Sequence, residues 1–186
     1  SFALETSLGY EQEHLGLRVK FRKVDPNYQS MGSYFFQNDL RNITLEPHAK
    51  FFNSALQVSG SYGYQTDNLD GTRESTTKRK IGSLNVSGRL GEKYTGNIYY
   101  SNYDIGQAAG KVALDTLIRI SQTVKSWGTL HNLMWSGDEL THTFMINYNN
   151  QTLTDRNPTT ALYTNYNMDT WLASYYATFN AVKISI

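Results

Sequence analysis

The chain has 186 residues, of which 39% are apolar and 18% are charged, and its formal net charge is +1. Both fractions lie below the roughly 45–50% and roughly 25% of ordinary soluble domains. Disorder would raise the charged fraction, and a helical membrane protein would raise the apolar one. The near-neutral charge without a basic run argues against nucleic acid as a partner, and the absence of cysteine excludes a disulfide framework or thiolate metal site. No cofactor is expected.

The first two predicted elements are the strands Phe2–Gln12 and His14–Val24. In the second strand, apolar side chains occupy every other position, and three of the positions between them are cationic. Successive side chains of a strand point to opposite faces, so one face is apolar and the other is charged. The apolar positions are Leu15, Leu17, Val19 and Phe21, and they alternate with Gly16, Arg18, Lys20 and Arg22.

The same alternation recurs along the chain without an intervening helix pattern, which is typical of an antiparallel β-barrel. The further predicted strands are Arg41–Phe52, Ala55–Thr66, Lys80–Leu90, Tyr94–Asn102, Thr116–Ser136, Leu140–Leu153, Tyr166–Phe179 and a short strand Ala181–Ile186. We expect one β-domain over residues 1–186.

Short and long connections between these strands alternate, as in a transmembrane barrel with tight periplasmic turns and long external loops. Trp127-Gly128 could be a turn, but splitting Thr116–Ser136 there would break the alternation, so we predict one long strand. With short turns in the periplasm, Ser1 would start on the outer side. Complete barrels begin and end in the periplasm, which predicts an internal or incomplete part of a larger barrel.

Two environments could cover the apolar face, either lipid or a second layer of protein. Strands longer than the usual ~5–6 residues, tyrosine and tryptophan near strand ends, and charges in mid-strand favour lipid. The alternative is a soluble β-sandwich whose polar face meets water.

Two segments resemble large outer-membrane β-barrel proteins of Bacteroidota. They are Asp25–Thr44, which reads DPNYQSMGSYFFQNDLRNIT, and Asp67-Asn-Leu-Asp with the following Thr76–Leu84, which reads TTKRKIGSL. The resemblance covers Val24–Asp104 and, more weakly, the strand from Thr116 and the loop after Leu153. It implies an outer-membrane location and a non-enzymatic role, as a pore or as a partner in an envelope machine. The short chain and a compressed loop at Gln107–Lys111 depart from it.

Ten ionisable residues are predicted to line the interior of the barrel. They could form an anion-selective surface, or a network of paired charges in a narrow lumen, which we favour because Glu46 lies among the cations and Glu5 and Glu11 share that face. The ten are Arg18, Lys20, Arg22, Glu46, His48, Lys50, Arg89, Arg119, Lys125 and His131.

The loop Asn27–Asp39 holds closely spaced aromatic and apolar side chains, which are costly to expose to water. They could dock a partner or fold back into the barrel mouth, and the second interpretation is slightly favoured. The candidates are Tyr28, Met31, Tyr34, Phe35 and Phe36.

Metal and enzyme interpretations have little support in the sequence. Asp70-Gly71 come too early for an EF-hand loop that starts at Asp67, so a turn is predicted there. The four histidines are scattered, although Asp115, Asp155 and Asp169 near loop ends leave a rim hydrolase open.

The sequence thus predicts a non-enzymatic integral β-barrel of a bacterial outer membrane. It would be a wall or scaffold component of a multi-protein complex for secretion, assembly or uptake. The expected partners are outer-membrane lipid and other outer-membrane proteins or lipoproteins. A small porin-like channel is the alternative, followed by a rim hydrolase.

Overall fold

The computed structural model describes residues 1–28, 38–111 and 119–180. These residues form one antiparallel sheet of nine strands and a single helical turn. The elements are β1 (Ala3–Glu11), β2 (Leu15–Val24), β3 (Leu40–Phe51), β4 (Leu56–Asp67), β5 (Ser75–Leu90), β6 (Tyr94–Ala109), β7 (Ser121–Ser136), β8 (Leu140–Asp155), α1 (Ala161–Thr164) and β9 (Tyr166–Phe179).

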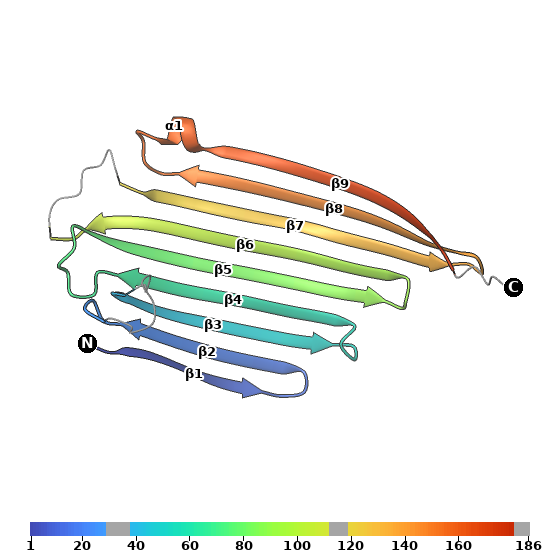
Figure 1. Ribbon diagram of the computed structural model, residues 1–186, viewed down its shortest axis with the longest axis horizontal. Helices are drawn as coiled ribbons and strands as arrows, with labels where there is room; N and C mark the ends of the chain where they lie inside the picture. The colour runs from blue at the N-terminus through green and yellow to red at the C-terminus, as the bar shows by residue number, and fades with distance from the viewer. Residues whose placement is uncertain (29–37, 112–118, 181–186) are drawn as a thin grey trace, which may run out of the picture.

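The strands lie side by side in chain order, from β1 to β9, as a single layer (Figure 1). Each strand pairs with its sequence neighbours, and within the described residues β1 and β9 do not pair with each other. The prediction of an all-β antiparallel sheet is therefore confirmed. The sheet is open and does not close into a barrel within the described residues. None of the helical segments in the described ranges has the length and hydropathy needed to span a bilayer.

The connections alternate as predicted: all tight turns lie at one end of the sheet, and the long connections and α1 lie at the other (Figure 1). We call these the short-turn end and the long-loop end. Trp127 lies within β7 and is opposite Tyr100 and Asn150, so the single-strand interpretation is confirmed. β7 begins at Ser121, and residues 112–118 and the predicted strand at 181–186 lie outside the described part.

Two strands extend further toward the long-loop end than predicted. β5 begins at Ser75 instead of Lys80, and β6 ends at Ala109 instead of Asn102. The β5 extension is polar on both faces and the β6 extension mixes small, polar and apolar residues on both, so neither shows a clear alternation. Pairing between the two strands continues to their ends, where Ser75 lies opposite Ala109.

The register divides the side chains between an apolar face and a polar face. The apolar face includes Leu17, Val19, Leu45, Val58, Val86 and Ile98, which follow one another across the strands β2 to β6. The polar face carries the side chains of the alternate positions, including Arg18 and Glu46.

Neither face is covered by another layer of the described chain. Val24, 1% exposed, and Leu40, 3% exposed, are the buried large apolar side chains in the described ranges. The accessible surface is 13249 Å², compared with about 9,000 Å² for a compact soluble protein of this size. The apolar face must therefore be covered by something other than the described residues.

Aromatic rings lie across glycines on both faces of the sheet. On the polar face a Cβ at Gly128 would meet the backbone oxygen of Tyr148 and the phenol of Tyr99. On the apolar face a Cβ at Gly96 would meet the phenol of Tyr94. Such pairs fill the space left by glycine and help to specify strand register.

We expect Gly128→Ala to destabilise the sheet by about 1–3 kcal/mol, because the added methyl group overpacks a position closed by backbone and ring. Urea unfolding monitored by tryptophan fluorescence measures the change. Gly106→Ala is the matched control, since a Cβ there meets no atom within 4 Å. Equal stability of the two variants would contradict this packing.

Candidate functional site

The most concentrated set of ionisable side chains lies on the polar face over β1 to β5. In register, Glu5 lies opposite Arg22, and Arg18 lies opposite Glu46. Cations outnumber carboxylates in this set, which we call the charged strip. Its members are Glu5, Glu11, Arg18, Lys20, Arg22, Glu46, His48, Lys50, Arg79 and Arg89.

One ion pair and one histidine–carboxylate contact cross between strands within the charged strip. Lys20 Nζ lies 2.8 Å from Glu46 Oε1, and His48 Nε2 lies 2.8 Å from Glu11 Oε1. The His48 ring covers Gly16, where a Cβ would collide with it. All four side chains remain partly exposed, and such pairs usually contribute at most about 1 kcal/mol. The pairs therefore orient the charges more than they stabilise the sheet.

Seven of the ten charged residues singled out from the sequence belong to this strip. Whether the polar face lines a lumen stays a prediction. The seven are Arg18, Lys20, Arg22, Glu46, His48, Lys50 and Arg89.

The prediction that all ten share one face is wrong for Lys125 and His131. Both lie on the apolar face of β7, where Lys125 is opposite Asn102 and His131 is opposite Gly96. Arg119 precedes β7 at the long-loop end, and its Nε donates a hydrogen bond to the backbone oxygen of Gln107, at 2.8 Å. Polar residues at alternate positions of β7 suggested a polar face, but pairing with β6 places them on the other one.

His131 is compatible with an apolar surrounding because both ring nitrogens have partners. The Tyr94 hydroxyl lies 2.6 Å from Nδ1, and the Thr129 hydroxyl lies 2.7 Å from Nε2. The Tyr94 and His131 rings also stack, with centroids 5.9 Å apart. Hydrogen-bonded polar groups cost much less free energy on an apolar face than unpaired ones.

Arg79 is a member of the strip that the sequence analysis missed. It lies on β5 between Gln65 and Ile105, and its Nη1 atom is buried without a hydrogen-bond partner in the described part of the chain. Arg79 lies an even number of residues from Arg89, which the sequence analysis assigned to the charged face, but the predicted strand began one residue after Arg79.

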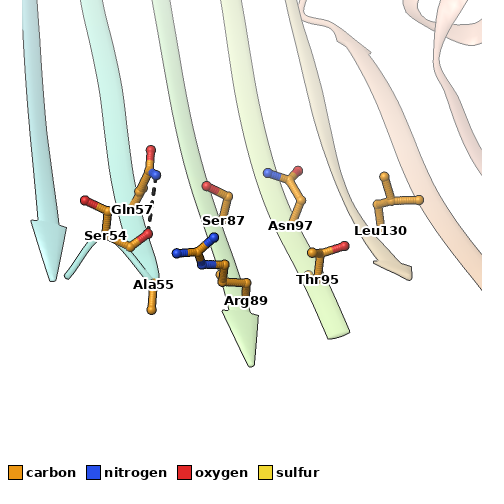
Figure 2. A pocket seen from close by; sticks show the side chains of 10 residues that line it. Ser54, Ala55, Gln57, Ser87, Arg89, Thr95, Asn97 and Leu130 are labelled. Atoms are coloured by element: carbon orange, nitrogen blue, oxygen red, sulfur yellow. Dashed lines mark hydrogen bonds between the residues drawn. The ribbon is translucent and has the colours of Figure 1, made fainter. Parts of the chain in front are cut away.

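A polar hollow of about 260 Å³ lies at the short-turn end of the same face. Figure 2 shows the Arg89 guanidinium among Ser54, Gln57 and Ser87, with Asn97 on the next strand. The Gln57 amide donates to the backbone oxygen of Ser54, at 3.4 Å. Guanidinium and amide groups in this arrangement could contact a small anion or another polar solute.

Of the five loop side chains predicted to dock a partner, Tyr28 lies in the described part. Its backbone N–H donates to the Asp25 carbonyl, at 3.1 Å, and the side chain is partly exposed. Met31, Tyr34, Phe35 and Phe36 lie outside the described residues, so docking and inward folding both stay predictions.

The connection from β4 to β5 is a turn, as predicted. Asp70 Oδ1 accepts hydrogen bonds from the Thr72 N–H, at 3.1 Å, and from the Thr72 hydroxyl, at 2.8 Å. Gly71 follows with a φ of 68°. In the ranges that the structure describes, no three His, Asp or Glu side chains are grouped so that they could hold a metal ion.

Asp155, one of the candidates for rim catalysis, is 4% exposed and holds the end of β8 to α1. Its Oδ2 accepts hydrogen bonds from the hydroxyls of Thr160, at 2.6 Å, and Thr164, at 2.9 Å. Burial raises the pKa of this carboxyl, but hydrogen bonds, led by those from Thr160 and the Asn157 backbone, outweigh it and lower the pKa to about 2.

The other two rim candidates give no support to catalysis. Asp169 accepts hydrogen bonds from the Tyr148 hydroxyl, at 2.6 Å, and the Asn150 amide, at 2.9 Å. Asp115 lies outside the described residues. Asp155 and Asp169 are thus engaged by hydroxyl and amide donors, as structural carboxylates are.

No protein-family model, curated protein or solved structure matches the chain.

Asp155 should make stability depend on pH at the acid end. Its folded-state pKa of about 2 lies below the ordinary value of 3.8, so its contribution, about 2 kcal/mol, is complete above pH 3.8 and is lost as the pH falls through 2. We expect Asp155→Asn to lower the free energy of unfolding at pH 7 by about that amount and to flatten the acid limb of the profile. Urea unfolding at a series of pH values measures both effects.

Asp138→Asn is the control for this experiment, because Asp138 is an exposed turn residue. A pH profile that is the same for the wild type and Asp155→Asn would show that the Asp155 contacts do not contribute to stability.

Proposed function

We propose that the chain forms part of the wall of a bacterial outer-membrane β-barrel and serves, without catalysis, as a scaffold component of a multi-protein envelope complex. One observation carries the proposal. The apolar face is a band with aromatic borders, and beyond one border the same face becomes polar.

The upper border follows the long-loop side of the band from strand to strand. The last apolar side chains before it, taken from β2 to β9, are Phe21, Ile43, Tyr64, Leu84, Tyr100, Trp127, Tyr148 and Trp171. The first polar side chains beyond it are Lys23, Arg41, Thr66, Lys80, Asn102, Lys125, Asn150 and Asp169.

This border is oblique to the register. Phe21, Ile43 and Tyr64 lie directly opposite one another, whereas Trp127 lies opposite Asn150, and Trp171 lies opposite Tyr148. At about 3.3 Å per residue and about 4.8 Å between strands, the border descends with a slope of roughly 30°. A flat bilayer surface that crosses tilted strands gives such a line, since barrel strands tilt by about 35–45°.

The lower border lies at the short-turn end, where Tyr94, Trp135 and Phe179 occupy the apolar face. From Trp127 to Trp135 the band extends for roughly 26 Å along β7, at about 3.3 Å per residue. The apolar band of outer-membrane barrels is about 25 Å tall. With strands tilted by roughly 30°, this length corresponds to a height of about 23 Å along the membrane normal, close to that of an outer-membrane barrel.

Aromatic side chains contact one another at both borders on β7 to β9, edge-on or tilted at the upper border and stacked at the lower one. At the upper border the Tyr148 ring centroid lies 4.9 Å from that of Trp127 and 4.3 Å from that of Trp171. At the lower border His142 stacks with Trp135 at 5.2 Å and with Tyr175 at 6.0 Å. Aromatic girdles of this kind anchor membrane proteins at the headgroup level.

A scaffold role is favoured by the polar face of β7 to β9. There the charged strip gives way to amides and hydroxyls mixed with large apolar side chains, which suit contact with protein better than with water. These apolar side chains are Val124, Leu130, Met134, Met145, Leu153 and Leu172. Other outer-membrane proteins or lipoproteins are the partners that we propose. A channel is the second candidate, favoured by the excess of cations in the charged strip.

The two faces should respond differently to an added charge. We expect Ile98→Arg, in the middle of the apolar band, to destabilise insertion by about 2–4 kcal/mol. Asn97→Arg, the adjacent residue on the polar face, should insert normally. Folding into lipid vesicles, read from heat-dependent mobility on gels, compares them. Equal insertion of both variants, or a folded wild type in buffer without surfactant, would refute the membrane assignment.

The channel candidate predicts an effect of charge on ion selectivity. If the strip lines a pore, Arg18→Glu with Lys50→Glu should move the reversal potential in planar bilayers toward cation selectivity. Lys93→Glu with Lys111→Glu, which carry the same charge change into exposed connections, is the control. Under the scaffold proposal neither double variant changes the reversal potential.

A further inference from the structure

Five cations lie on the apolar face just beyond the upper aromatic border, toward the long-loop end. They come from β2, β3, β5 and β7, and we call this set the basic belt. Its members are Lys23, Arg41, Lys78, Lys80 and Lys125.

Most of the basic belt has no carboxylate partner within the described residues. Lys23 Nζ lies 3.1 Å from Asp25, but no ion pair joins the other four cations to a carboxylate in the described ranges. On this face of β2 to β7 the one carboxylate among the described residues is Asp104, which lies directly opposite Lys80. Its Oδ1 already accepts hydrogen bonds from Thr123, at 2.7 Å, and from Arg156, at 2.5 Å.

The spacing of the belt is regular. Arg41, Lys80 and Lys125 each occupy the first polar position beyond the border, on β3, β5 and β7. Alternate strands are about 10 Å apart, and neutral side chains such as Thr66 and Asn102 lie between. All three cations are exposed. Their aliphatic stems can lie along the band while the charged groups reach the headgroup level.

We propose that the basic belt binds the phosphate groups of anionic lipids in the leaflet at the long-loop end of the barrel. This inference rests on the proposed membrane location. Charge complementarity carries it, because exposed cations that outnumber the carboxylates near them lie directly beyond the apolar band and its aromatic border. Lipid phosphate is the anion that is present at that depth all around a barrel.

The test compares two variants with identical loss of charge. The belt variant carries Arg41→Gln, Lys80→Gln and Lys125→Gln. The control variant carries Arg18→Gln, Lys50→Gln and Arg89→Gln, three cations of the polar face. Each protein is folded in detergent micelles that contain equal amounts of phosphatidylglycerol and phosphatidylcholine, and native mass spectrometry measures the lipids that it retains.

We expect the wild type and the control variant to retain phosphatidylglycerol preferentially, and the belt variant to lose at least tenfold of that preference, since each cation near an anionic surface contributes on the order of a fivefold factor. Phosphatidylcholine retention should be unchanged. Equal loss in both variants, or equal retention in all three proteins, would overturn the proposal. So would suppression of the preference by millimolar inorganic phosphate, which would indicate a free-anion site.

Failure of the membrane assignment gives a different result. A wild type that stays folded in surfactant-free buffer and retains neither lipid would refute the proposed function as well as the belt. A wild type that requires detergent but shows no preference for the anionic lipid would refute the belt alone.

Discussion

A sheet one layer thick has no interior, so its stability depends on what lies against its apolar face. In this protein the backbone groups of seven strands are paired on both sides, but the side chains of the apolar face meet no other described part of the chain. Burial of that face, at roughly 25 cal/mol per Å², must come from outside the sheet. The position of the aromatic borders and the location of the charges follow from this requirement.

The same constraint applies to polar groups on the apolar face, which need hydrogen-bond partners there. Within the band, His131 has a hydroxyl partner at each ring nitrogen, and His142 has the Tyr175 hydroxyl 2.6 Å from its Nδ1. Beyond the upper border the constraint ends, and amides, carboxylates and lysines occupy the same face. Where the connections begin, Asp155 and its threonine partners replace apolar packing as the source of local order.

The alternation of apolar and polar residues was sufficient to predict nine strands, their antiparallel order and the alternation of short and long connections. It failed for the faces of β7. There Thr123, Lys125, Thr129 and His131 form a polar series along the strand, and Val124, Leu130 and Met134 form an apolar one. Pairing of Trp127 with Tyr100 places the polar series on the apolar face. The sequence of one strand cannot show which face its polar series occupies. That assignment depends on the register with neighbouring strands and on the upper border, which crosses β7.

The two sets of cations differ in what surrounds them, although β2, β3 and β5 contribute to both. In the charged strip, Lys20 pairs with Glu46, and Glu5 lies opposite Arg22, so carboxylates are placed among the cations within the sheet. In the basic belt, compensation by carboxylates is confined to Lys23 and to the surroundings of Asp104 in the described ranges. A net charge of +1 for the whole chain therefore conceals an uneven distribution. The apolar face carries the less compensated cations, and these lie just beyond the aromatic border of the apolar band.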